Sequence, residues 1–459
     1  MPPSIADAQE AEAFLDAHPQ MQFFDLVYTG LSGVPRGKRL RRSELAPLYQ
    51  QGRFLPSSLL VSDITGRDVE ETGFIWEEGD KDRVARPIAG RLTAAPWLGN
   101  DVAQIPVSAY EQNGAAFDLD PRHVLARVID RFAADSLTPV VACELEFYLL
   151  DTARDAQGRV QLARWPMSGR RPAHHDQYAL DELAEAMPLL RELWAACDAM
   201  GLPLEGAIGE YGPGQLEITL RHRNDALAAA DDAVLFKRAA KGVALKHDCE
   251  ATFMAKPFAQ FAGSGLHVHV SIDDAQGANI FAADNSEGAP PLRHAIGGLQ
   301  ALLGESMAVL APNANSYRRF KANSYAPVAP LWGVDNRTCA FRVPAGAPQS
   351  RRIEHRVAGA DAHPALALAV LLAGVHHGLT NALDPGPPVA GNGYEAAAGR
   401  ALIPANWPEA LGRFSQSALL ADYLGEAFVR TYATVKQAEH DRYQSVVPDV
   451  DYEWYGRAS

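Results

Sequence analysis

The sequence is poor in cysteine and in basic charge. Its 459 residues include four cysteines that lie far apart and form no Cys-x-x-Cys motif, namely Cys143, Cys197, Cys249 and Cys339. This spacing argues against a disulfide framework and a zinc ribbon, and it favours a reducing compartment. Acidic residues outnumber basic ones by 56 to 42, so the net charge is −14. That balance argues against nucleic acid or an anionic membrane as the main partner.

Long uncharged stretches and targeting signals are also lacking. We expect no apolar run to approach the roughly 18 residues that a helix needs to span a bilayer. The first residues include Asp7, Glu10, Glu12 and Asp16, and they lack the basic start and apolar core of a secretion signal. The hydrophobic share of 47% is ordinary for a globular protein. The sequence therefore predicts a soluble, cytoplasmic protein.

The chain divides into two regions of different pattern. From Phe23 to Trp97, short strand-like pieces are broken by Gly and Pro, which favours a small, mostly β domain. Residues 98–118 are rich in small and polar residues and are expected to form a linker. Asp120 can then cap a helix that begins at Pro121. We therefore predict an N-terminal domain at residues 1–115 and a second domain at residues 116–459.

Four segments of the second domain alternate polar and apolar residues, as strands with one buried face do. They are 140–150, 214–220, 265–272 and 352–357. Their polar faces carry Glu144, Glu146, Gln215, Glu217, Thr219, His267, His269, Ser271, Arg352, Glu354 and Arg356. His355 falls on an apolar face and is expected to be structural. Helices are expected at about 181–200, 225–248 and 364–383.

These polar faces predict a chemistry. Carboxylates on an apolar strand are costly unless a cation meets them. For one strand a solvated face is the simpler interpretation, but four such strands in one domain favour a shared concave site. Carboxylates with an imidazole suit Mg²⁺ or Mn²⁺, and clustered arginines suit carboxylates and phosphates. Because phosphoryl transfer needs mainly positioned cations, the pattern predicts a metal-dependent enzyme that uses a nucleotide.

Six ordered motifs resemble the glutamine synthetase superfamily, from about residue 20 to the C-terminus. They are Glu144-x-Glu146, Glu210–Glu217, Thr252–Pro257, Gly263–His269, Asn336-Arg337 and Arg352–Arg356. Within the superfamily, the segments 315–319, 332–337 and 352–361 are most similar to the γ-glutamylputrescine synthetase branch. The resemblance implies an α+β fold, with a β-grasp-like N-terminal domain and a catalytic domain whose open, curved antiparallel sheet is flanked by helices. It also implies hexameric or dodecameric rings with active sites between subunits.

The resemblance further implies a role for each matching residue. One metal ion, Mg²⁺ or Mn²⁺, would be held by Glu146, Glu210 and Glu217, and the other by Glu144, His267 and Glu354. The ATP-contacting positions match His269, Ser271 and Arg352. The glutamate-binding positions match Arg319, Arg356 and the flexible Gly263. Arg337 and Arg342 match the arginines beside the transferred phosphate.

In the implied reaction, ATP phosphorylates the side-chain carboxylate of glutamate, and a nitrogen nucleophile then displaces phosphate from the acyl phosphate. Family members that use ammonium hold it with an acidic residue of the N-terminal domain and a flap glutamate. Here these positions fall on Leu55 and Tyr325, and the family's Asn before the flexible glycine is Ala262. Losing both carboxylates removes the charge that would concentrate and deprotonate ammonium. We therefore predict an organic amine as nucleophile, with its carbon skeleton near Leu55 and Tyr325.

Other interpretations stay open at this point. A true glutamine synthetase is the alternative within the same chemistry, and a non-catalytic structural homologue is the alternative from another class. The amine itself is also open: a polyamine would want acidic residues such as Asp63, Asp68, Glu70 and Glu71, whereas a monoamine would want an apolar lining such as Leu55, Tyr325 and Trp332. Tyr394 lies near the loop where some relatives are adenylylated, but its neighbours differ from the usual ones.

Overall fold

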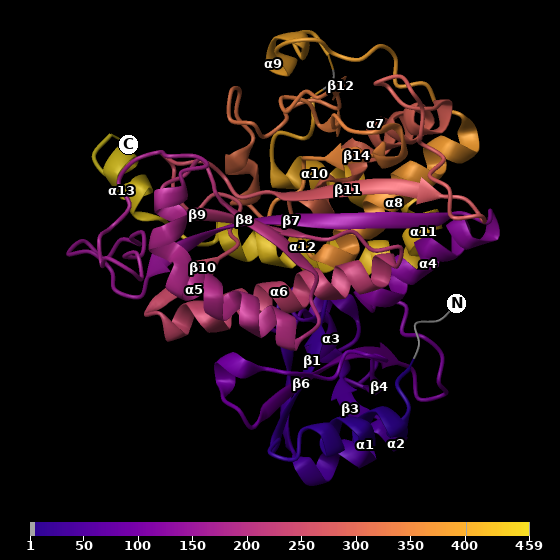
Figure 1. Cartoon of the computed structure of the whole chain (residues 1–459), viewed down its shortest axis with the longest axis vertical. Helices are drawn as coiled ribbons and strands as arrows, with labels where there is room; N and C mark the ends of the chain where they lie inside the picture. The colour runs from indigo at the N-terminus through magenta and orange to yellow at the C-terminus, as the bar shows by residue number, and fades with distance from the viewer. Residues whose placement is uncertain (1–4, 401, 459) are drawn as a thin grey trace.

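The computed structural model describes residues 5–400 and 402–458, which form two sheets with helices packed against them (Figure 1). The N-terminal sheet has the strand order β2-β1-β6-β4-β3, with β5 paired to β6. Its strands are β1 (Phe23–Thr29), β2 (Pro35–Arg41), β3 (Arg53–Pro56), β4 (Asp82–Pro87), β5 (Thr93–Ala94) and β6 (Val102–Tyr110). Its helices are α1 (Ala8–Ala17), α2 (Leu45–Gln51) and α3 (Ser57–Val61). In Figure 1 this indigo region lies at the bottom, with α1 and α2 at its outer end.

The expected linker at residues 98–118 is wrong, because its middle is strand β6. All nine residues of β6 are buried, and the strand pairs with β1 in parallel and with β4 and β5 in antiparallel fashion. A strand covered on both faces carries small and apolar residues without alternation, so its sequence lacks the period of two. Helix α4 (Pro121–Ala134) begins as predicted, since the Asp120 carboxylate accepts from the backbone N–H groups of Arg122 and His123. The N-terminal region is thus mixed α and β, and its β-grasp-like description stays a prediction.

The second sheet has the order β12-β13-β14-β11-β7-β9-β8, with β10 paired to β7. Its strands are β7 (Thr138–Asp151), β8 (Leu204–Gly209), β9 (Gln215–Leu220), β10 (Cys249–Thr252), β11 (Leu266–Asp273), β12 (Trp332–Val334), β13 (Phe341–Val343) and β14 (Ile353–His355). Its pairs are antiparallel except for β12 with β13. The long strands β7 and β11 run side by side through the middle of the molecule in Figure 1. The expected α+β fold with an open, mostly antiparallel sheet is confirmed.

Helices of the second region pack against this sheet and against one another. They are α5 (Leu180–Ala199), α6 (Ala226–Lys246), α7 (Pro290–Leu310), α8 (Pro364–Asn381), α10 (Trp407–Ser415), α11 (Ala418–Leu424) and α12 (Glu426–Gln444). Phe147 of β7 lies with its ring centroid 6.1 Å from that of Phe236 in α6 and 5.3 Å from that of Phe253. Shorter helices α9 (Gly393–Ala396) and α13 (Asp449–Tyr455) lie outside this layer. The residues that alternate with Glu144 and Glu146 thus build the core.

Helix α8 corrects one expectation from the sequence. Among the described residues it is the one helix long and apolar enough to cross a membrane, whereas no such stretch was expected. In the structure, 78% of that stretch is buried inside the fold, where α8 packs against α7 and α4. Its His376 contacts Tyr423 and Asp135. Helix α8 is therefore a buried core helix that is surrounded by other parts of the protein.

Ion pairs join the two regions of the chain. Arg238 of α6 lies 2.5 Å from Asp25 of β1, and Arg91 lies 2.8 Å from Asp232 of α6. The carboxylate of Asp120 also accepts from the backbone N–H of Ala109 in β6, at 2.7 Å. A domain boundary at residues 115 and 116 stays a prediction. All four cysteines are free, and all are buried.

Candidate active site

The hydrogen-bond register of the second sheet places its polar residues in one row. Glu146 lies opposite Glu217, and Glu144 lies opposite His267. Further along the row, His269 lies opposite Glu354, which in turn lies opposite Arg342. Directly paired residues of antiparallel strands project from the same face, so these side chains meet. Strand β14 is shorter than the predicted 352–357, yet its alternation holds: Glu354 joins the row.

His355 lies on the opposite, buried face of β14. Its ring centroid is 5.4 Å from that of Phe341, and burial together with the nearby His267 lowers its pKa to about 3. The imidazole is therefore neutral and packed in the core, as a structural residue would be.

Three carboxylates form a compact group at one end of the row. Glu146, Glu210 and Glu217 each offer an oxygen, and these oxygens lie within 4.8 Å of one another. Burial and the neighbouring Glu210 raise the pKa of Glu146 to about 8, and burial also raises the pKa values of Glu210 and Glu217. Like charges this close cannot all ionise without a cation. An all-carboxylate donor set suits a hard divalent ion.

Glu144 belongs to two further groups of possible ligands. One combines Glu144 with Glu217 and His267, and the other combines Glu144 with His269 and Glu354. The expected set of Glu144, His267 and Glu354 is thus divided between two overlapping groups that share Glu144. The ring of His267 lies between the two glutamates of β7, at 3.4 Å from Glu144 and 3.6 Å from Glu146. Burial and Arg356 lower the pKa of His267 to about 4, so the ring is neutral and can offer a nitrogen lone pair to a metal.

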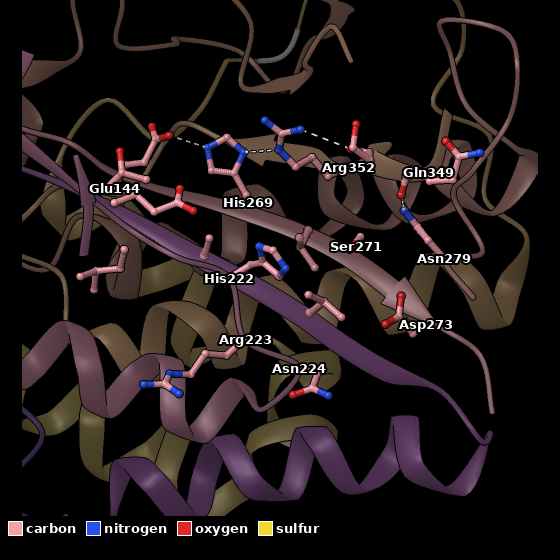
Figure 2. A pocket seen from close by; sticks show the side chains of 17 residues that line it. Glu144, His222, Arg223, Asn224, His269, Ser271, Asp273, Asn279, Gln349 and Arg352 are labelled. Atoms are coloured by element: carbon pink, nitrogen blue, oxygen red, sulfur yellow. Dashed lines mark hydrogen bonds and ion pairs between the residues drawn. The ribbon is translucent and has the colours of Figure 1, made fainter. Parts of the chain in front are cut away.

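His269 has a defined tautomer. Arg352 Nε donates to His269 Nδ1 at 3.0 Å, so this ring nitrogen is the acceptor. The proton of the neutral ring is therefore on Nε2, which donates to Glu144 at 2.8 Å. Burial disfavours the charge on Glu144, but its hydrogen bonds to His267 and His269 lower the pKa of this carboxyl below its usual value. Figure 2 shows the chain from Glu144 through His269 to Arg352.

Two arginines hold Glu354 at the other end of the row. Arg342 donates to one carboxylate oxygen at 2.6 Å, and Arg356 donates to the other oxygen. Although burial opposes ionisation, Arg356 is the main reason that the pKa of Glu354 falls to about 2. The Nε of Arg356 is buried and has no hydrogen-bond partner among the described residues. An unpaired buried N–H of a guanidinium is a donor that an anionic ligand could satisfy.

The other expected arginines differ in their surroundings. Arg319, in the short helix Ser316–Arg319, is buried and donates to the backbone oxygen of Val357 at 2.8 Å. Arg337 is exposed. Burial raises the pKa of Tyr178, and the charge of Arg337 partly opposes this rise. The charges of Glu210 and Glu217 also raise the pKa of Tyr178. This residue adopts a left-handed backbone conformation, with φ of 63°. The sequence pattern had not singled out this tyrosine.

Gly263 lies where a side chain would not fit. A Cβ atom there would lie 2.7 Å from the backbone oxygen of Ala255 and 2.7 Å from Cγ of Arg319. Gln215, which shares the polar face of β9 with Glu217, joins this loop to the carboxylates. Its Nε2 donates to Glu146 at 3.1 Å and to the backbone oxygen of Gly263 at 3.0 Å. Gln215 thus links the loop to the carboxylates. The sequence pattern predicted the face on which it lies but no role for it.

A cavity of about 750 Å³ adjoins the row (Figure 2). The three residues that match ATP-contacting positions, His269, Ser271 and Arg352, all line it, with Glu144 at its wall. It is also lined by polar residues that the sequence did not indicate, namely His222, Arg223, Asn224, Asn279 and Gln349. Asn279 donates to the backbone oxygens of Gln349 and Arg351, so it fixes the loop that precedes Arg352. These wall residues come from loops, where no periodic pattern marks them.

The residues proposed to contact the amine are not all accessible. Tyr325 is 55% exposed, whereas Leu55 has 0% exposure and packs within the N-terminal core. A position of Leu55 near the amine pocket stays a prediction. Asp63 and Trp332 are buried too, with structural partners in Arg442 and the backbone of Gly386. Neither of these two can line a pocket as arranged here.

Together, the open sheet, its row of carboxylates and the adjoining cavity define a ligase of the class that the motifs indicate. The family model described as "Glutamine synthetase, catalytic domain" matches residues 118–455. The chain belongs to the glutamine synthetase family.

Several relatives within this family are named as ligases of amines. The chain is 39% identical to the gamma-glutamylputrescine synthetase PuuA of Escherichia coli K12, over 98% of this chain and 94% of that protein. It is 32% identical to a glutamate–isopropylamine ligase of a Pseudomonas species, over 95% and 94% of the two chains. It is also 32% identical to the gamma-glutamylethanolamide synthetase GlnA4 of Streptomyces coelicolor, over 92% and 90%.

Solved structures give the same result for the fold. A complex of GmaS with ADP superposes with a TM-score of 0.83 at 26% identity, over 96% of this chain and 98% of that chain. GmaS without ligand superposes with a TM-score of 0.84 at the same identity, over 97% and 99%.

Proposed function

We propose that this chain is an ATP-dependent ligase that joins the γ-carboxylate of glutamate to an organic amine, in amine breakdown or detoxification. The observation that carries the proposal is the position of Glu144, which lines the cavity and also belongs to the groups of possible metal ligands. A nucleotide in the cavity would therefore place its phosphates beside the row. The amine ligases among the relatives support an amine as the second substrate.

The nucleotide would be ATP, held in the cavity by His269, Ser271 and Arg352. Two or more divalent ions, Mg²⁺ or Mn²⁺, would be held by the six proposed ligands: Glu144, Glu146, Glu210, Glu217, His267 and Glu354. The raised pKa of Glu146 and the neutral state of His267 fit this role, because both indicate a site built for added positive charge. When bound, the ions would neutralise charge on the phosphates.

Glutamate would be bound by Arg319 and Arg356, beside Gly263. Within the part of the chain that the structure describes, the buried Nε–H of Arg356 has no partner and could donate to a carboxylate of glutamate. The absence of a Cβ at Gly263 lets the backbone and Arg319 approach closely. The side-chain carboxylate of glutamate attacks the terminal phosphorus of ATP, so that ADP leaves and γ-glutamyl phosphate forms. Arg342, fixed by Glu354, and the exposed Arg337 would stabilise the transferring phosphoryl group.

The amine nitrogen then attacks the acyl carbon, and phosphate leaves with the bonding electrons. The nitrogen must lose a proton in this step, which a general base at the site would accept. Tyr325 at the flap supplies an aromatic surface where ammonium-using relatives are expected to have a carboxylate. Leu55 contributes only the absence of a charge, since it is buried.

The enzyme would work in the cytoplasm as a ring of copies. The C-terminal segment exposes a series of apolar side chains, which are Val446, Val447, Tyr452, Trp454 and Tyr455, and Trp76 of the N-terminal region is 72% exposed. Exposed apolar groups in such number are typical of surfaces that another chain covers. The ring would hold six or twelve copies, as the family resemblance implies.

The test is the release of phosphate from ATP and glutamate, with ammonium compared with putrescine, isopropylamine and ethanolamine, and with the γ-glutamyl amide identified by mass spectrometry. We expect at least one amine to give a higher kcat/KM than ammonium. Ammonium as the best nucleophile would identify a glutamine synthetase instead. Glu354→Ala should abolish ligation, and an unchanged rate would contradict the metal assignment. No nucleotide turnover by the wild type with any nucleophile would favour a non-catalytic homologue.

A further inference from the structure

The flap at residues 321–327 has a backbone that needs support. It follows the short helix that ends at Arg319 and carries Tyr325. Two of its residues, Asn323 and Tyr325, adopt left-handed backbone angles, with φ of 59° and 58°. This conformation is tolerated by asparagine but is unfavourable for a bulky aromatic residue, so it persists only where surrounding contacts hold it.

Part of that support is local. Ser324 lies between the two left-handed residues, and its hydroxyl donates to the backbone oxygen of Lys321 at 2.6 Å. The backbone N–H of Ala326 is directed to the same hydroxyl, at 3.4 Å. The hydroxyl also lies 3.3 Å from the backbone oxygen of Arg319, so these contacts shape the turn and join it only to the end of the preceding helix.

The attachment comes from a distant part of the chain. The hydroxyl of Tyr394, in α9, donates to the backbone oxygen of Ala326 at 3.1 Å. That oxygen belongs to the peptide between Ala326 and Pro327, so the bond holds the chain directly after the exposed Tyr325. The Tyr394 ring is half-buried, and the flap residues Ser324 and Tyr325 together with Arg319 contribute to its electrostatic surroundings.

Helix α9 is itself firmly placed. Asn392 caps it, and the backbone N–H of Gly393 donates to the hydroxyl of Thr338 at 2.8 Å. A Cβ at Gly393 would lie 2.8 Å from the backbone oxygen of Thr338, so the helix approaches this turn as only glycine allows. Asn336, on the other side of Arg337, donates to the backbone oxygens of Val389 and Gly391.

An apolar cluster completes this arrangement. Ala397 and Ala396, at the end of α9, pack with Ala329 and Leu331, which follow the flap, and with Cys339. One short segment thus contacts the turn that carries Arg337, the chain after the flap, and the flap itself.

We propose that Tyr394 is a positioning residue for the amine step: its hydroxyl holds the flap so that Tyr325 covers the route by which the amine reaches the acyl phosphate. This inference rests on the proposed function. Tyr394 thereby acquires a structural role that differs from the adenylylation known at this loop in some relatives. A held flap would also keep water from the acyl carbon, where attack by water releases phosphate and returns glutamate without forming the amide.

The variant that tests this is Tyr394→Phe, which keeps the ring and removes the hydroxyl. One neutral hydrogen bond corresponds to about a threefold to tenfold effect. We therefore expect the KM for the amine to rise by about that factor, while the KM values for ATP and glutamate change less than about twofold. The ratio of phosphate released to γ-glutamyl amide formed should rise above one. The matched control is Glu395→Gln in the same helix, which contacts Asn392 and should behave as wild type.

A second measurement does not depend on activity. Lys321 is exposed at the start of the flap, so its cleavage by trypsin reports how well the flap is held. Tyr394→Phe should be cleaved there several-fold faster than wild type and than Glu395→Gln. Unchanged amine KM and cleavage rate, or an equal loss for all three substrates, would overturn the proposal. If the wild type forms no amide with any amine, the proposed function fails, whereas the cleavage rates still decide whether Tyr394 holds the flap.

Discussion

Replacing Glu217 with glutamine should have opposite effects on the metal-free and the metal-loaded protein. The oxygens of Glu146, Glu210 and Glu217 lie within 4.8 Å of one another. Two ionised carboxylates at that distance repel by about 3.5 kcal/mol at an effective dielectric constant of about 20. Glu217→Gln keeps the shape and removes one charge, so it should stabilise the metal-free protein by up to about this amount.

The gain should depend on pH. Carboxyls whose pKa values are raised in the folded state contribute stability that is complete below their unfolded pKa and is lost as pH rises through the folded value. For Glu146 this window runs from the ordinary glutamate pKa of 4.5 to the raised pKa of about 8. The Tm of Glu217→Gln should therefore equal that of wild type near pH 4.5 and exceed it near pH 8. For 459 residues, an unfolding entropy of about 2.1 cal/mol/K per residue converts the full gain into a Tm increase of roughly 3–4 °C.

Divalent metal should reverse this order of stability, so that wild type melts at a higher temperature than Glu217→Gln. A ligand at a hundred times its Kd stabilises the folded state by about 2.7 kcal/mol, and the variant should lose most of this because it lacks one ligand. The assay is thermal melting of EDTA-treated protein at several pH values, with and without Mn²⁺. The control is Glu12→Gln, which removes one charge from an exposed position of α1. A lower Tm for metal-free Glu217→Gln at pH 8, or a wild-type response to Mn²⁺, would refute the reasoning.

Two further predictions concern the loop beside the row. Gln215→Leu removes the donors to Glu146 and to the backbone oxygen of Gly263. Because unpaired buried acceptors cost about 1–3 kcal/mol each, Mn²⁺ binding should weaken about tenfold or more. Calorimetric titration measures this affinity, and an unchanged value would contradict the link through Gln215. Gly263→Ala places a Cβ 2.7 Å from Arg319. We expect the KM for glutamate to rise at least about tenfold, while the KM for ATP stays nearly unchanged. An equal change in both KM values would contradict a local effect.

Periodic and local features of the chain were predictable from the sequence. Alternation in β7 and β11 placed Glu144, Glu146, His267 and His269 on one face, because burial of the opposite face requires a period of two. The Asp120 cap marked the start of α4 correctly. Both signals are short-range and are dictated by chemistry within a few residues.

Other features depend on partners that are distant in the chain. Strand β6 is buried on both faces between β1 and β4, and this contact left no alternation to detect. Leu55 was matched to the family's acidic position through the short segment Phe54–Ser58. The pairing of β3 with β4 turns Leu55 inward and leaves Phe54 exposed. The cavity wall also comes from loops joined only in the fold, such as those of Asn279 and Gln349.

The register of the central sheet is what couples the fold to the chemistry. Residues two apart on a strand are separated by about 6.8 Å, so Glu144 and Glu146 can serve neighbouring ligand groups, with His267 on the adjacent strand between them. A slip of one residue would turn both carboxylates into the core and bring Leu145 to the polar face. The apolar residues packed against α6 therefore do more than stabilise the sheet: by fixing its register they fix which carboxylates meet. For that reason we attribute the position of Glu144, on the cavity wall and within two ligand groups, to the core beneath it as much as to its own contacts.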